Sequence, residues 1–247
     1  MTKVVCALLL DLDDCADFPG NDASVLGRPL CAYPLMAARS SAHVRRIYAL
    51  TSSPAVKAAA LQYDAVILDP LKTKPSVSEY LLHGWRRISQ ELLGENALLE
   101  VLVVLLSNAA AVTKDLIDSG VEALLDRPEL DSAITATPLE RWMPDQTRRL
   151  ASDGLLIPFW PQKSALPAET AWHPTGGAAI LRPKGIESSD FLGTKVFPLK
   201  TWGPGPIDHP WQIPGLEYWL KKHGIPDLSP HLERQPRPQP KASPKGR

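Results

Sequence analysis

The stretch that most constrains the fold is an unbroken run of apolar residues at positions 4–10, which ends at Asp11. A strand turns alternate side chains to opposite faces, so this run predicts a strand buried on both faces, as in a parallel sheet. Residues 34–41 have the pattern of a helix, and residues 44–51 that of a second buried strand. Strand, helix and strand in this order predict two parallel strands joined by a right-handed connection.

In sheets of this kind, ligands bind beyond the carboxyl ends of the strands. The first strand is followed by residues 11–26, a loop that is rich in Asp and contains Gly20 and Asn21. The second strand leads into residues 51–53. We therefore expect residues 11–21 and 51–53 to border any binding site.

The rest of the chain repeats this alternation. Helices are predicted at residues 54–63, 76–93, 113–119 and 214–223. Further strands are predicted at residues 65–68, 101–106, 131–137, 177–181 and 196–199. The run at 101–106 is the most hydrophobic and is predicted to be central, whereas Pro198 places the last strand at an edge. The order predicts an α/β fold, with a three-layer, doubly wound, mainly parallel sheet.

Four helix ends are predicted from the residues at or near them. Ser76 and Glu79 have the spacing of a capping box, and Gly94 is predicted to end the helix that they begin. Thr113 is predicted to cap the next helix, and Gly120 to end it.

Residues 142–172 interrupt the alternation and predict a small arm that projects from the domain. Short strands are expected in it near residues 148–150 and 155–157, on either side of a turn. Residues 228–247 consist mostly of Pro, Lys, Arg, Ser and Gln, with almost nothing to bury, and are predicted to be a disordered tail. The predicted domain therefore spans residues 1–227.

Composition excludes several classes of function. A chain of 247 residues, 44% of them hydrophobic, is long enough for one domain with a full core. Its formal net charge of +0 provides no field to attract nucleic acid or an anionic membrane. No apolar run approaches the roughly 20 residues of a membrane-spanning helix. Three cysteines without metal-ligand spacing, and no signal-peptide pattern, predict a reduced cytoplasmic protein.

Several short sequence motifs occur in this chain in the same order as in a known protein family. They lie at residues 26–30 (LGRPL), 44–48 (VRRIY), 131–135 (DSAIT), 153–159 (DGLLIPF) and 207–208 (ID). Through them the chain resembles the cytidylyltransferases that make CMP-activated sugars, the acylneuraminate and related CMP-sugar synthetases. The resemblance implies a nucleotide-diphospho-sugar-transferase-like fold and a homodimer formed through the arm. It also implies transfer of CMP from Mg²⁺-bound CTP to an acidic sugar or similar small acid, with release of pyrophosphate.

The resemblance further implies which residues form the site. Asp208 matches a carboxylate that holds Mg²⁺, and is implied as metal ligand and catalytic residue. The residues implied to bind the nucleotide are Leu10, Gly20, Asn21 and Asn108, and those implied to contact the acceptor are Arg148 and Gly176. Each polar or glycine position also has a purely structural interpretation, as a turn residue, a solvated side chain or a site of close backbone packing.

The chain departs from the family where phosphate should bind. The family's first loop carries an arginine and two lysines that neutralise the triphosphate, and Leu12, Ala16 and Asn21 occupy these positions here. The loop instead carries aspartates at positions 11, 13, 14, 17 and 22, which repel a triphosphate unless a metal ion bridges them. Pro210 replaces the second metal-binding aspartate. This degenerate loop predicts weak or lost activity.

Two alternatives remain open from the sequence. One is a pseudoenzyme, a non-catalytic descendant that keeps the fold for binding or regulation. The other is a haloacid-dehalogenase-like phosphatase, because Asp11 and Asp13 stand one residue apart after an apolar strand. Asp11 would then attack a phosphoryl group, with Asp13 as acid and base and Mg²⁺ between them. Against this interpretation, Asp14 stands where that motif has glycine.

Overall fold

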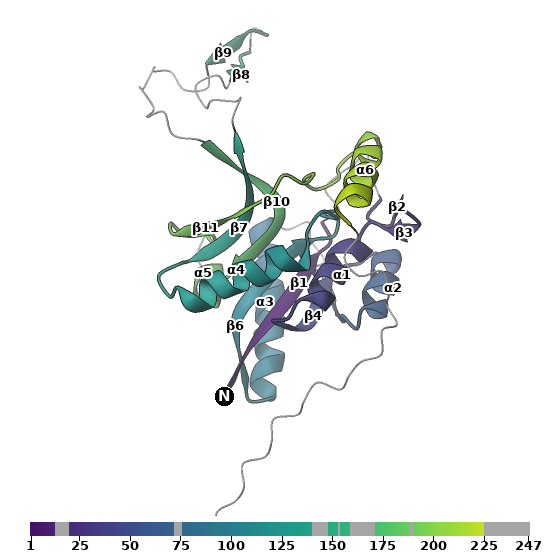
Figure 1. The fold of residues 1–247 in the computed structure, drawn as a ribbon. Helices are drawn as coiled ribbons and strands as arrows, with labels where there is room; N and C mark the ends of the chain where they lie inside the picture. Colours follow the sequence, from purple (N-terminus) through teal and green to yellow (C-terminus); the bar gives the residue numbers. More distant parts are fainter. Residues whose placement is uncertain are drawn as a thin grey trace, which may run out of the picture.

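The computed structural model describes residues 1–12, 20–71, 76–139, 148–152, 154–158, 171–187 and 190–224. Within these residues the central sheet has seven strands in the order β11-β7-β10-β6-β1-β4-β5 (Figure 1). The strands are β1 (Thr2–Leu10), β4 (Val44–Leu50), β5 (Val66–Leu68), β6 (Ala97–Leu106), β7 (Ser132–Leu139), β10 (Ala171–Leu181) and β11 (Val196–Lys200).

The sheet is mixed but mainly parallel. β10 runs antiparallel to its neighbours β6 and β7, and the other neighbouring pairs are parallel. β6 stands in the middle of the order, between β1 and β10, which confirms the central position predicted for the run at 101–106. β11 lies at an edge, as Pro198 predicted.

Helices cover both faces of this sheet (Figure 1). One face carries α1 (Ala32–Ser40), α2 (Pro54–Gln62) and α4 (Lys114–Asp126), and the other carries α3 (Val77–Gly94) and the short α5 (Pro183–Ile186). The side chains of β1 alternate between two cores, with Leu9 in the first and Leu8 in the second. The unbroken apolar run therefore serves both faces, and the predicted three-layer fold is confirmed.

A third, smaller core covers the carboxyl end of β6. It contains α6 (Ile213–His223) and a hairpin of β2 (Ser24–Val25) and β3 (Arg28–Pro29). Leu216 of α6 shares a cluster with Val25 and with Ala110, which follows β6. Glu217 adds a polar link, because its Oε1 accepts a hydrogen bond from Leu26 N–H at 3.1 Å.

The hairpin corrects the prediction of a loop that reaches residue 26. Leu26 and Gly27 both have positive φ, 47° and 78°, which is the backbone conformation that reverses a chain tightly between two strands. Leucine rarely adopts this conformation. The local sequence therefore gave little sign of the turn, which is held by the packing against α6.

The capping box predicted for α3 is confirmed. The Ser76 hydroxyl accepts a hydrogen bond from Glu79 N–H at 3.3 Å, and the Glu79 carboxylate accepts one from Ser76 N–H at 2.7 Å. The bonds that the Ser76 N–H and hydroxyl donate to the carboxylate hold the pKa of Glu79 below its usual value. At the other end Gly94 is itself the last helical residue, and the positive φ falls at Asn96.

The predicted end of α4 is wrong, because the helix continues through Gly120 to Asp126. A Cβ at position 120 would lie 2.8 Å from Ile180 Cδ1 and 3.0 Å from Leu199 Cδ1, both on the sheet. Glycine is therefore present here because the helix lies close to the sheet. Tertiary packing outweighs the local preference of glycine for helix ends.

β10 begins at Ala171, earlier than predicted, and its pairing with β7 shifts register between Pro174 and Ala179. In the arm, β8 (Arg148–Leu150) and β9 (Leu156–Pro158) form the expected antiparallel pair. Residues 142–147 and 159–170 of the arm and the tail at 228–247 lie outside the described residues, so the homodimer stays a prediction. No helix in the described parts of the chain has the length and apolar character needed to cross a bilayer.

We expect Gly120→Leu to lower the free energy of unfolding by about 1–3 kcal/mol, because the new side chain must displace packed core residues. Urea denaturation followed by circular dichroism measures this change. Gly94→Ala is the matched control: a Cβ there meets no atom within 4 Å, so its stability should equal or slightly exceed that of the wild type. Equal stability of the two variants would contradict the close contact at Gly120.

Candidate functional site

Three neighbouring parallel strands, β4, β1 and β6, end side by side at one edge of the sheet. The residues that follow them are Thr51, Asp11 and Ser107, respectively. Asp11 N–H donates to Leu50 O at 3.1 Å, and Ser107 N–H donates to Leu10 O at 3.0 Å. The strand order reverses at β1, with β4 and β5 on one side and β6 on the other. Sheets of this kind bind ligands at such a reversal of the strand order.

The Asp11 carboxylate lies at the centre of this edge and is only 5% exposed. Its Oδ1 accepts hydrogen bonds from Asn21 Nδ2 at 2.5 Å and Ser107 Oγ at 2.9 Å, and its Oδ2 accepts one from Thr51 Oγ1 at 2.5 Å. We call these four residues the Asp11 cluster. The three donors offset the cost of burying a charge, and they tie the first loop to the ends of β4 and β6.

The cluster gives Asn21 a partner that the sequence did not reveal. Asn21 does lie at the predicted edge, but its amide N–H donates to Asp11. Two further nucleotide-binding candidates have backbone roles: Leu10 O accepts from Ser107 N–H, and Gly20 O accepts from Ala23 N–H at 2.8 Å. Nucleotide contact by these three residues stays a prediction. The sequence feature that could have predicted the cluster is a hydroxyl residue directly after each strand beside β1, Thr51 after β4 and Ser107 after β6.

The structure brings Asn108 and Asp208 together. Asn108 Nδ2 donates to Asp208 Oδ1 at 3.1 Å and to Ile207 O at 3.2 Å, and Ile207 N–H donates back to Asn108 O at 3.0 Å. Gln212, in the 3-10 turn η2 (Pro210–Gln212), accepts hydrogen bonds from the N–H groups of Asp208 and His209, each at 2.8 Å. Since Asn108 directly follows Ser107, the Asp208 carboxylate is held beside the end of β6.

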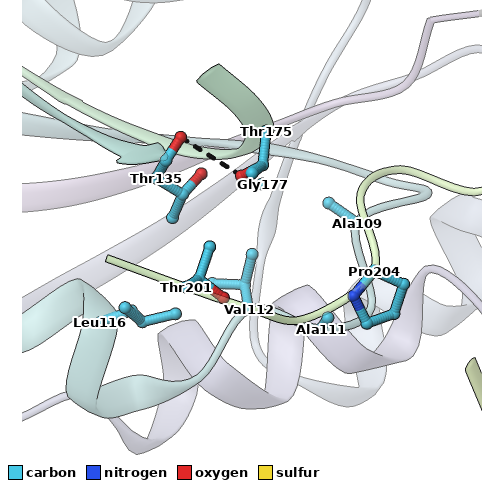
Figure 2. Close-up of a pocket in the computed structure, with 9 residues that line it drawn as sticks. All are labelled: Ala109, Ala111, Val112, Leu116, Thr135, Thr175, Gly177, Thr201 and Pro204. Carbon is cyan, nitrogen blue, oxygen red and sulfur yellow. Dashed lines mark hydrogen bonds between the residues drawn. The ribbon is translucent and has the colours of Figure 1, made fainter. Parts of the chain in front are cut away.

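A pocket adjoins this site, between the loop after β6 and the strands β7 and β10 (Figure 2). Its enclosed space is about 10 Å³, room for about one water molecule, and the hollow around it opens to solvent. Its lining residues are Ala109, Ala111, Val112, Leu116, Thr135, Thr175, Gly177, Thr201 and Pro204. Gly177 keeps the space open, because a Cβ there would lie 3.0 Å from Thr135 Oγ1 and 3.3 Å from Val112 Cγ2. Thr175 Oγ1 donates to Thr135 O at 3.2 Å, the dashed line in Figure 2.

The two residues predicted to contact the acceptor differ in position. Gly176 precedes Gly177 of the pocket, has φ of 72°, and would bring a Cβ to 3.3 Å from Pro206 Cγ. The positive φ and the close contact with Pro206 explain why glycine occupies position 176. Arg148 begins β8, which Figure 1 shows apart from the central sheet. Substrate contact by either residue stays a prediction.

Metal binding depends on Asp208 in this arrangement. Among the described residues, no three His, Cys, Asp or Glu side chains gather into a group that could hold a metal ion. Asp208 provides one carboxylate, the type of ligand that Mg²⁺ prefers, and Mg²⁺ takes further oxygens from nucleotide phosphates and water. Pro210 offers no side-chain oxygen. The residues therefore fit a Mg²⁺ ion that arrives with a nucleotide.

The structure disfavours Asp11 as a phosphatase nucleophile and disfavours Cys6 and Cys31 as thiolate nucleophiles. A phosphatase nucleophile must present a carboxylate oxygen to its substrate, whereas both oxygens of Asp11 accept hydrogen bonds in a buried cluster. Its predicted partner Asp13 lies outside the described residues. Burial raises the pKa of the Cys6 and Cys31 thiols to about 12, so neither is a thiolate near neutral pH.

No family model matches the chain, and no curated protein sequence matches it. Solved structures match its fold. CMP:2-keto-3-deoxy-manno-octonic acid synthetase complexed with CTP is similar over 90% of this chain and 100% of its own length, with a TM-score of 0.64 and 12% identity. 4-diphosphocytidyl-2C-methyl-D-erythritol synthase from Anaerococcus prevotii is similar over 89% of this chain and 99% of its own length, with a TM-score of 0.62 and 14% identity.

This chain has the fold of the cytidylyltransferases. The expected nucleotidyltransferase architecture is thereby confirmed. At such low identities the likeness shows the fold alone and does not single out the acylneuraminate enzymes, because one fold hosts many functions.

We expect Thr51→Val to lower the free energy of unfolding by about 1–3 kcal/mol, because it removes one of three donors to a buried carboxylate without changing the shape of the side chain. Ser52→Ala removes a hydroxyl from the exposed neighbouring residue and should change stability by less than about 0.5 kcal/mol. Urea denaturation at pH 7 measures both. If both variants were as stable as the wild type, the Asp11 cluster would not be structurally important.

Proposed function

We propose that the protein is a nucleotidyltransferase of the cytidylyltransferase type. It binds CTP with Mg²⁺ at the carboxyl ends of β1 and β6, and it transfers CMP to a small acceptor with release of pyrophosphate. The observation that carries this proposal is the contact between Asn108 and Asp208 at this edge of the sheet. Support for the nucleotide comes from the fold shared with a synthetase solved in complex with CTP.

In the proposed reaction, Asp208 would hold Mg²⁺, and the bound ion would offset the negative charge of the phosphates. Asn108 is a positioning residue, because its amide donates to Asp208 Oδ1. The acceptor would bind in the open space beside the neighbouring pocket, and its hydroxyl oxygen would bond to the α-phosphorus, losing its proton to solvent, as the bond to pyrophosphate breaks. The resemblance implies an acidic sugar or similar small acid as this acceptor.

A second function, non-catalytic binding or regulation, is favoured by the Asp11 cluster. Its side-chain donors point to a carboxylate of the protein itself, which occupies them in place of a phosphate. Leu12, which follows Asp11, packs partly buried against the core beneath α3 and provides no positive charge. A protein with these features keeps a nucleotide-binding fold whose phosphate contacts are weakened.

Pyrophosphate release from CTP and Mg²⁺ by the purified chain, with candidate acceptors present, tests the first function. We expect Asp208→Asn to lower this rate by roughly 100-fold, because an amide replaces the charged metal ligand. Asp126→Asn is the control; Asp126 is exposed at the end of α4, and this change should leave the rate unchanged.

Isothermal titration of the wild type with CTP and Mg²⁺ separates the two functions. Binding without pyrophosphate release, with every acceptor tried, supports the non-catalytic function. Equal rates for Asp208→Asn and the wild type would contradict the role of Asp208.

A further inference from the structure

The three donors of the Asp11 cluster come from three separate segments: Asn21 from the first loop, Thr51 from the end of β4 and Ser107 from the end of β6. One amide and two hydroxyls converge there on one point, where the strand order reverses. Such a set of donors suits the oxygens of an anion. The Asp11 carboxylate already accepts from all three donors, so the protein carries its own anion at this edge of the sheet.

No salt bridge joins Asp11 to a Lys or Arg in the described parts of the chain. Between Asp11 and Asn21 the sequence contains neither Lys nor Arg, and it adds Asp13, Asp14 and Asp17. A buried charge is poorly screened, because the surrounding protein has a lower dielectric constant than water. A phosphate group that approaches this edge therefore meets repulsion from the protein.

We infer that Asp11 is the specificity-determining residue of this site, and that it makes the site favour cytidine compounds with fewer phosphates. The carboxylate takes the donors that a phosphate would use, and its charge opposes each phosphate added. This inference rests on the proposed binding of a cytidine nucleotide at the same edge. It predicts that cytidine and CMP bind to the wild type at least as tightly as CTP.

The same site should respond to salt in an unusual direction. At a site that attracts phosphate through positive charge, added salt weakens binding, because it screens attraction. Here salt screens the buried carboxylate only in part, so the affinity of the wild-type chain for CTP should rise slightly, and should not fall, between low salt and about 0.15 M, the range over which the Debye length falls to about 8 Å. Cytidine, which is uncharged, should bind equally well at both salt concentrations. This measurement needs no variant.

Replacement of Asp11 tests the residue directly. Asp11→Asn preserves the size of the side chain and removes its charge, so we expect the dissociation constant for CTP to fall by about tenfold or more. The constant for CMP should fall less, and that for cytidine should change by less than about threefold, since cytidine has no phosphate to repel. Isothermal titration with cytidine, CMP and CTP, each with and without Mg²⁺, gives these constants.

Asp22→Asn is the matched control, because it removes one charge from an exposed residue of the same loop without touching the cluster. It should change CTP affinity by less than about threefold, since solvent screens exposed charges. Circular dichroism checks that each variant is folded. If Asp11→Asn does not fold, Asp11→Ala is tested instead, in a thermal-shift assay with CTP. CTP should raise the melting temperature of Asp11→Ala more than it raises that of the wild type.

The outcomes separate this inference from the proposed function. Wild-type binding that tightens strongly from cytidine to CTP and weakens with salt would overturn the inference while supporting nucleotide binding. An unchanged or weaker CTP affinity in Asp11→Asn would also overturn it. If neither the wild type nor the variant bound cytidine, CMP or CTP, both the inference and the proposed function would fall.

Discussion

The burial of β1 on both faces is the constraint on which the rest of the structure depends. Leu8 and Leu9 are completely buried on opposite sides, and a buried leucine contributes about 1.5–3 kcal/mol relative to an exposed one. β1 pairs with β4 along one side and with β6 along the other. Because both its faces and both its edges are occupied, the end of β1 has one position, and Asp11 follows it directly.

The position of Asp11 gives its carboxylate both a structural and an electrostatic effect. As a structural group, the carboxylate joins three segments that would otherwise end independently at the edge of the sheet. As an electrostatic group, it would oppose a phosphate that approached this edge. The Thr51 and Ser107 hydroxyls each have a single O–H to donate, so neither can serve Asp11 and a phosphate at once.

Much of the fold could be predicted because its signals are local. The apolar runs located β1, β4 and β6, and the spacing of Ser76 and Glu79 located the start of α3. The end of α4 was predicted wrongly because the need for glycine at position 120 does not come from the neighbouring sequence. Gly120 lies in the middle of a helix and packs against Ile180 of β10. The turn at Leu26 was missed for the same reason.

The candidate site was less predictable, since its contacts join residues far apart in the sequence. Asp11 bonds to Thr51 and Ser107, which are 40 and 96 residues away, and no spacing rule connects them. Asn108 and Asp208 were identified through the resemblance to a family, and the structure then showed that they touch. The sequence left open whether Gly176 and Gly177 serve close packing or a gap for substrate, and it could not show that Gly177 faces Thr135 and Val112 from distant parts of the chain.

The contact between the β2–β3 hairpin and α6 also bears on how the protein is made. Leu26 and Glu217 are 191 residues apart, so the ribosome has synthesised most of the chain before these partners can meet. Until then Val25 and Ala110 lack the apolar cover that Leu216 provides. The sheet can begin to form during translation, whereas the edge that carries the candidate site is completed only after α6 has left the exit tunnel.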